Sequence, residues 1–144
     1  MSPGAGRVTI LHASCVALAG RGVLILGPSG AGKSALALQL MAYGCTLVSD
    51  DRTAVAAEAG MILAAAPARI RGLIEARGVG ILAADAIATA RVVLAVDLGL
   101  PETERLPVRH SRRLLGVTLP VLHRVESAHF PAAILQYLKA GRSE

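Results

Sequence analysis

The chain has 144 residues, of which 53% are hydrophobic and only 17% are charged. That length suits one domain, and the apolar content excludes a disordered linker protein because it can offset the entropy that ordering costs. There is no Trp, one Phe and two Tyr, so we expect an aliphatic core of the kind found around parallel strands. The scarcity of aromatic side chains also argues against a surface that stacks the bases of single-stranded nucleic acid.

The charge balance and the cysteine content limit the classes of binding partner and the cellular compartment that we expect. Fifteen basic against ten acidic residues give a net charge of +5, and the basic residues concentrate in the last third of the chain. An acidic protein partner or a phosphorylated ligand explains this excess, and we expect neither nucleic acid nor a membrane as partner. Cys15 and Cys45 lack the spacing of metal or redox pairs, and no run of 18 apolar residues occurs, so we expect a cytoplasmic protein.

The pattern of apolar runs and turn residues predicts a strand-rich α/β domain. In chain order, we expect strands at 8–11, 16–19, 23–26, 46–49, 53–57, 61–65, 91–96 and 117–122. The run at 23–26 is continuously apolar, as a central strand buried on both faces would be. The runs at 53–57 and 61–65 flank Glu58-Ala59-Gly60 and are expected to form a hairpin.

Two helices are expected, and two segments look irregular. The first helix covers 35–43 and is ended by Gly44, and the second covers 132–140, with Pro131 in its first turn and Gly141 beyond its end. Residues 67–82 are punctuated by glycine and carry several charges, which favours a functional loop over a regular element. Residues 101–116 are polar and basic, and we expect a loop with short structure there.

A complete phosphate-binding motif connects the strand at 23–26 to the first helix. Its residues are Gly27, Pro28, Ser29, Gly30, Ala31, Gly32, Lys33 and Ser34, which fit the pattern G-x-x-x-x-G-K-S. The glycines let successive backbone N–H groups surround phosphate oxygens, and the helix N-terminus adds partial positive charge. Lys33 is expected to neutralise the β- and γ-phosphates, and the Ser34 hydroxyl to ligate Mg²⁺. The motif therefore predicts a nucleotide site.

Two acidic positions compete for the role beside the phosphates. Asp97 follows the apolar run Val92–Val96, which is the usual pattern for an acidic residue at the end of a neighbouring strand. Asp50 and Asp51 follow the strand at 46–49 and supply two adjacent carboxylates, of which one could support the metal and the other take a proton. Either position could also be a structural strand end.

Four blocks of the sequence together resemble the catalytic domain of HPr kinase/phosphorylase. These blocks are His12, the phosphate-binding motif, Val48-Ser49-Asp50-Asp51 and the segment Ile74-Glu75-Ala76-Arg77-Gly78-Val79-Gly80-Ile81. The last block matches a signature loop of the form I-E-x-R-G-x-G-I, and all four occur in the family's order. The resemblance spans about residues 8–125 and implies one catalytic domain over 1–144 without the family's N-terminal domain. It also implies an α/β fold with a mixed central sheet, similar to phosphoenolpyruvate carboxykinase.

The resemblance assigns a role to each matching residue. It implies that ATP is bound by residues 27–34 and that Mg²⁺ is bound by Ser34 and Glu75. It further implies that Asp51 accepts the proton of the substrate hydroxyl, which leaves Asp97 a structural role. The remaining catalytic residues implied in this way are His12, Lys33, Arg77 and Arg105.

The implied activity is an ATP-dependent serine kinase acting on the phosphocarrier protein HPr, in sugar or nitrogen phosphotransferase signalling, with members assembling as hexamers. Pro28, Ala35 and the segment 120–124 depart from the family pattern, and these changes bear on the reverse phosphorolysis more than on the kinase reaction. Two alternatives stay open on the residues alone. They are a small-molecule kinase with the same phosphate-binding motif, and a regulatory module that senses ATP without transferring phosphate.

Overall fold

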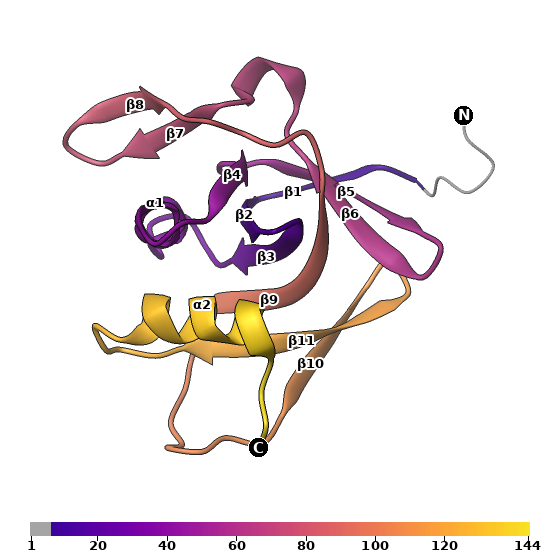
Figure 1. Cartoon of the computed structure of the whole chain (residues 1–144), viewed down its shortest axis with the longest axis vertical. Coiled ribbons are helices and arrows are strands. Elements are labelled where there is room, and N and C mark those ends of the chain that lie inside the picture. Colours follow the sequence, from indigo (N-terminus) through magenta and orange to yellow (C-terminus); the bar gives the residue numbers. More distant parts are fainter. Residues whose placement is uncertain (1–6) are drawn as a thin grey trace.

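The computed structural model describes residues 7–144. Its strands are β1 (Thr9–Leu11), β2 (Ala13–Leu18), β3 (Arg21–Leu26), β4 (Thr46–Ser49), β5 (Thr53–Glu58), β6 (Met61–Ala65), β7 (Leu73–Ala76), β8 (Gly80–Ala83), β9 (Ala90–Pro101), β10 (His110–Leu114) and β11 (Val117–Arg124). Its helices are α1 (Lys33–Ala42), the short 3-10 helix η1 (Ala68–Ile70) and α2 (Phe130–Ala140). Figure 1 shows how these elements are arranged.

The main sheet is mixed and divides at β9. Its strand order is β1-β5-β6-β9-β3-β2-β4, and β3 runs parallel to β9 along most of that strand. On the other edge of β9, residues 90–92 pair with the antiparallel strand β6, and residues from Ala95 onward pair with the parallel strand β11. Strand β11 pairs in turn with β10. The expected α/β fold with a mixed central sheet is confirmed.

Both faces of the central strands are buried. In β3, Val23 and Ile25 face the layer that contains α1 and α2, whereas Leu24 faces the opposite layer with residues of β2, β5 and β6. This alternation follows from the two-residue period of a strand. This alternation explains why the sequence 23–26 is continuously apolar, as predicted. The buried strand also holds Gly27, which follows it, at a fixed place beside α1.

The two helices begin and end close to the predicted positions. Helix α1 ends at Ala42 and is followed by Gly44, whose φ of +111° suits a residue without a Cβ. Helix α2 carries Pro131 in its first turn and is followed by Gly141 at φ +75°. Within residues 7–144, no helix is long and apolar enough to cross a membrane.

The prediction that residues 67–82 form a loop is wrong. Strands β7 and β8 form an antiparallel hairpin there, which projects from the body of the molecule in Figure 1. Ile74 and Ala76 are buried, whereas Leu73 and Glu75 are exposed, so the segment has the alternation of a strand. With only four residues per strand, the charges and glycines hid that alternation.

The prediction that a strand ends at Asp97 is also wrong. Strand β9 continues to Pro101 because Leu98 is buried in the core and β11 pairs with β9 as far as Pro101. Residues 101–116 contain a loop at 102–109, followed by β10, which pairs with β11. Strand β11 likewise extends two residues past its predicted end.

Candidate active site

The phosphate-binding motif forms a tight loop between β3 and α1. Gly27 has a φ of +148°, and a Cβ there would lie 3.2 Å from the Cβ atoms of both Ala31 and Leu98. The amide of Ala31 donates to the carbonyl of Pro28 at 3.1 Å, and α1 begins directly after Gly32. The loop therefore directs backbone N–H groups and the N-terminus of a ten-residue helix toward one point, which is a favourable arrangement for an anion.

The Lys33 side chain lies against the loop. Its Nζ atom donates to the carbonyl oxygens of Gly27 at 2.8 Å and Pro28 at 3.1 Å, and the residue is buried. The ammonium group thus lies beside the backbone amides of the loop. It adds a full positive charge to the partial charge of the helix N-terminus.

Asp50 is buried and joins four elements. Its Oδ1 atom accepts hydrogen bonds from the hydroxyl of Ser34 at 2.7 Å and from that of Ser14 at 2.8 Å. Its Oδ2 atom accepts one from the backbone N–H of Glu75 at 3.0 Å. Because these partners belong to α1, β2 and β7, the carboxylate after β4 fixes the hairpin and the helix relative to the sheet.

Asp51 faces the cavity because its backbone is left-handed. Its φ is +66°, a conformation that aspartate tolerates better than most residues, and its N–H donates to the Ser14 hydroxyl at 3.1 Å. The Asp51 carboxylate lies 2.7 Å from Nε2 of His12. His12 lies at the bend between β1 and β2, and its side chain is 49% exposed. The break in the strand turns the imidazole out of the sheet and toward Asp51.

These residues surround a cavity of about 620 Å³. It is lined from the hairpin side by Glu75, Arg77 and Val79, and from the loop side by Lys33 and Ser34. His12 and Asp51 complete the wall. The structure therefore brings together six of the seven predicted catalytic and metal-binding residues, from segments far apart in the sequence.

Arg105 does not reach this cavity. It is exposed in the loop at 102–109, which lies at the opposite end of the molecule from the β7–β8 hairpin in Figure 1. Asp97 is also absent from the lining residues. Its Oδ1 atom accepts from the N–H of Gly99 at 2.8 Å, and its Oδ2 atom lies 3.5 Å from Arg112. Of the two acidic positions, Asp51 therefore lines the cavity and Asp97 does not.

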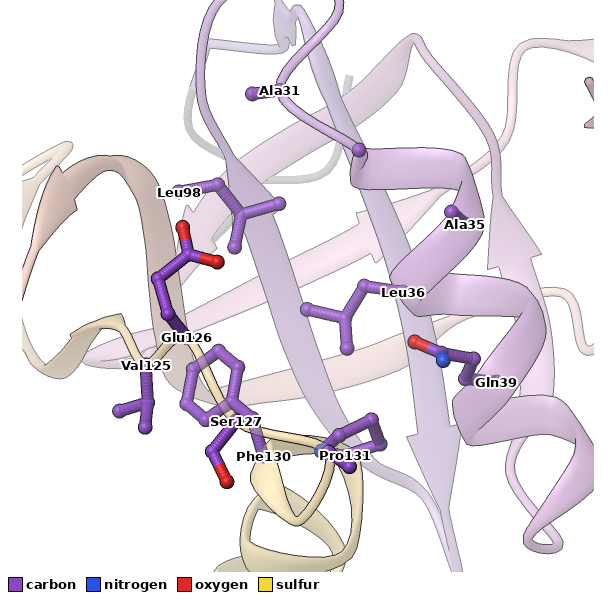
Figure 2. A pocket seen from close by; sticks show the side chains of 12 residues that line it. Ala31, Ala35, Leu36, Gln39, Leu98, Val125, Glu126, Ser127, Phe130 and Pro131 are labelled. Atoms are coloured by element: carbon purple, nitrogen blue, oxygen red, sulfur yellow. The ribbon is translucent and has the colours of Figure 1, made fainter.

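A second cavity, of about 430 Å³, lies on the other side of the loop (Figure 2). The side chains of Leu36, Leu98 and Phe130 point toward one another across it, and Ser127 and Glu126 lie on the segment between β11 and α2. Both cavities are lined by Gly32, Ala35 and Gln39, so they adjoin across the start of α1.

Sequence reasoning missed the roles of Ser14 and Asp50. The pair Asp50-Asp51 was visible, but only Asp51 was assigned to the site, because the local sequence does not show which carboxylate is buried. Ser14 lies in an otherwise apolar strand and is fully buried. A buried hydroxyl needs a hydrogen-bond partner, so a lone serine in such a strand is a signal that could have been used.

The arrangement has three chemical capabilities. The loop, the helix N-terminus and Lys33 can bind an anion with several negative charges. The exposed carboxylate of Asp51 can accept a proton from a group placed in the cavity. The oxygen atoms of Ser34, Asp50 and Glu75 are hard donors, which is the ligand type that Mg²⁺ prefers.

Comparisons with known proteins show which family the chain belongs to. The sequence model for the HPr Serine kinase C-terminal domain matches residues 5–98. HPr kinase/phosphorylase of Geobacillus sp. (strain WCH70) is 41% identical over 100 residues, which are 64% of this chain and 32% of that protein. HPr kinase/phosphorylase of Aromatoleum aromaticum is 39% identical over 129 residues, which are 80% of this chain and 41% of that protein.

The fold has a solved counterpart. The structure of the HPr(Ser) kinase/phosphatase from Coxiella burnetii matches with a TM-score of 0.77 at 24% identity, over 91% of this chain and 94% of that chain. The chain spans only about a third to two-fifths of the length of the two curated relatives named above. Because the family's sequence model covers well over half of the chain, the chain belongs to the family of the HPr Serine kinase C-terminal domain.

Proposed function

We propose that this protein is a kinase that transfers the γ-phosphoryl group of ATP to a serine hydroxyl of the phosphocarrier protein HPr. The single observation that carries the proposal is the cavity of about 620 Å³, where Asp51 faces the phosphate-binding loop and its Lys33. A carboxylate beside a phosphate-binding loop supplies what transfer to a hydroxyl needs, namely a proton acceptor next to the γ-phosphate. The relatives' name, HPr kinase/phosphorylase, supplies the acceptor protein.

In this mechanism the residues act by position and charge. Lys33 and the loop amides neutralise the phosphate oxygens, and Arg77 adds a cation from the hairpin. The serine oxygen of HPr attacks the γ-phosphorus while the bond to the β–γ bridging oxygen breaks and ADP leaves. Asp51 takes the serine proton. His12 orients the Asp51 carboxylate through their 2.7 Å contact.

Mg²⁺ fits the donor set of the site. We propose Ser34 and Glu75 as its protein ligands. Asp50 holds the Ser34 hydroxyl by a 2.7 Å hydrogen bond and fixes the backbone of Glu75, so both donors are oriented by one buried carboxylate. When bound, the ion would offset the negative charge of the phosphates.

The cavity in Figure 2 suits the nucleoside part of ATP. Because it adjoins the first cavity across Gly32 and Ala35, a triphosphate on the loop would direct its base and ribose there. Leu36, Leu98 and Phe130 offer apolar contacts to a base, and Gln39 and Ser127 offer polar groups.

The other expectations follow from the family resemblance and remain part of this proposal. They are a catalytic role for Arg105, a cytoplasmic location and a hexameric assembly. Exposed apolar side chains at Val79 and Ile81 on the hairpin, 75% and 65% exposed, support contact with another protein surface. Light scattering of the purified chain would measure the assembly directly.

The test is an assay of phosphoryl transfer from labelled ATP, with and without purified HPr. Label on HPr that disappears when its acceptor serine is replaced by alanine supports the proposal. Transfer to a small molecule in the absence of HPr would indicate a small-molecule kinase. Tight ATP binding with no transfer to any acceptor would indicate a nucleotide-sensing module.

A further inference from the structure

A second group of ligand-type side chains lies outside the proposed kinase site. Glu102 follows the end of β9, His110 begins β10 and His123 lies in β11; we call these three residues the His–Glu cluster. One ligand atom from each residue lies within 4.8 Å of the other two. The antiparallel pairing of His110 with Val121 places the two histidines on neighbouring strands, and their rings stack with centroids 3.8 Å apart.

The Glu102 carboxylate is oriented before any ligand arrives. Its Oε2 atom accepts from the backbone N–H groups of Thr103 at 3.0 Å and Glu104 at 3.2 Å. Its Oε1 atom is directed at the histidines, 2.9 Å from Nε2 of His110 and 3.9 Å from Nδ1 of His123. The hydrogen bond from His110 lowers the pKa of Glu102 from its ordinary value.

We propose that the His–Glu cluster binds one divalent transition-metal ion of the Zn²⁺ class. Two imidazole nitrogens and one carboxylate form a ligand set that zinc uses when a fourth position is left for water. Bonds of about 2.0–2.1 Å in a tetrahedral site separate ligand atoms by roughly 3.3 Å. The two distances from Glu102, 2.9 and 3.9 Å, lie on either side of that value.

Metal binding requires one local change. The two rings are parallel within 7°, and a nitrogen lone pair lies in the plane of its ring, so both cannot point at one ion in this arrangement. Binding would require one imidazole to turn about its χ2 angle, while the Glu102 carboxylate is held by its backbone partners. The side chains are 11–26% exposed, so the ion can enter from solvent.

The consequence is a metal-dependent link between the two ends of the loop at 102–109. Glu102 lies at its start and His110 directly after its end, so an ion bound to both would fix the loop at its two ends. His123 would tie the same ion to β11, which pairs with the central strand β9. The loop carries Arg105, but the site is separate from the cavity around Asp51 and does not depend on the proposed kinase activity.

The test is titration of the metal-free full chain with Co²⁺, whose visible absorption reports tetrahedral coordination, followed by displacement with Zn²⁺. We expect one equivalent of Co²⁺ to bind at the His–Glu cluster. Glu102→Gln, His110→Ala and His123→Ala should each weaken this binding by at least about tenfold. His129→Ala is the matched control, because His129 is exposed and pairs with Ser127 outside the cluster, and it should bind as the wild type does.

Stability measurements keep the proposal testable if one histidine variant does not fold. Zn²⁺ should raise the Tm of the wild-type chain and of His129→Ala, and EDTA should reverse the rise, because the ion binds the folded state. The same Zn²⁺ should leave the Tm of Glu102→Gln unchanged. Absence of stoichiometric Co²⁺ binding, or binding with the wild-type affinity in all three cluster variants, would overturn the proposal.

Discussion

The region up to residue 98 and the region after it hold their reactive side chains in different ways. In the first, which the family's sequence model matches, the backbone sets the positions: a glycine loop, a helix start and the left-handed Asp51. In the second, Glu102, His110 and His123 meet only because strands pair across the sheet. The phosphate-binding loop has a fixed sequence spacing, whereas a contact made by the pairing of distant strands has none.

The two regions also differ in how far their charged side chains are buried away from solvent. Asp50 is buried and receives three hydrogen bonds from three elements, so it is part of the structure of the site. Arg105 and Arg112 in the second region are exposed, where charges contribute little to stability. Substitutions in the first region should therefore have the larger effects.

The largest effect is expected at Lys33. Lys33→Ala removes the only lysine beside the loop, and transfer from ATP should fall by at least about 10³-fold because the phosphate charge is no longer neutralised. Lys139→Ala is the control, since Lys139 is exposed in the last turn of α2. Wild-type turnover in Lys33→Ala would remove the loop from the mechanism.

The next effect separates the two acidic positions. Asp51→Asn keeps the shape of the side chain but removes its ability to take a proton, so transfer should fall by about 10²–10⁴-fold while ATP affinity survives. Asp97→Asn should leave turnover nearly unchanged and cost at most some stability, because Asp97 contacts Gly99 and Arg112 outside the cavity. Both variants should be assayed side by side. An inactive Asp97→Asn beside an active Asp51→Asn would reassign the proton acceptor.

The contrast between positions set by the local backbone and positions set by strand pairing also explains which features the sequence could predict. The loop at 27–34, the strand before it and the helix after it were predicted because glycine, lysine and hydroxyl occur at fixed local spacing. Most strands of the first region were predicted from apolar runs that a two-sided core requires. The family resemblance then selected Asp51, Glu75 and Arg77, which the structure places on one cavity.

What the sequence could not predict depends on contacts between distant segments. The burial of Asp50 follows from Ser14 and Glu75, 36 and 25 residues away. The continuation of β9 past Asp97 follows from its pairing with β11, and the His–Glu cluster from the register of β10 and β11. Pairing between strands that are distant in the sequence leaves no local pattern, whereas the β10–β11 pairing is that of a hairpin with a turn at Leu115 and Gly116.

A substitution after residue 98 can test whether that region contributes to the nucleotide site. Ser127→Trp should fill the cavity of Figure 2 and weaken ATP binding by roughly tenfold or more, because the base would be excluded from its apolar contacts. Binding of inorganic tripolyphosphate, measured by calorimetry, should not change. Ser111→Trp on exposed β10 is the control. Equal losses for ATP and tripolyphosphate would place the nucleoside elsewhere.

A smaller effect is expected for Glu75→Gln. The carboxylate of Glu75 is exposed and faces the cavity, and only its backbone N–H binds Asp50, so the fold should be retained. A neutral amide is a weaker ligand for a hard cation than a carboxylate, so the Mg²⁺ concentration that gives half-maximal transfer should rise about threefold to tenfold. Titration of transfer activity with Mg²⁺ measures this change, and an unaltered Mg²⁺ dependence would remove Glu75 from the metal site.

The smallest effect concerns the pH dependence of stability in the second region. The His110 hydrogen bond, helped by the N–H groups of Glu104 and Thr103, lowers the pKa of Glu102 below its ordinary value of 4.5. A carboxyl whose pKa is lowered on folding contributes stability above its unfolded pKa, and that contribution is lost as the pH falls through the folded pKa. The free energy of unfolding of wild type relative to Glu102→Gln, measured with urea, should therefore decrease as the pH falls below about 4.5. A difference that is independent of pH in acid would show that the ionised carboxylate does not hold β10 to the end of β9.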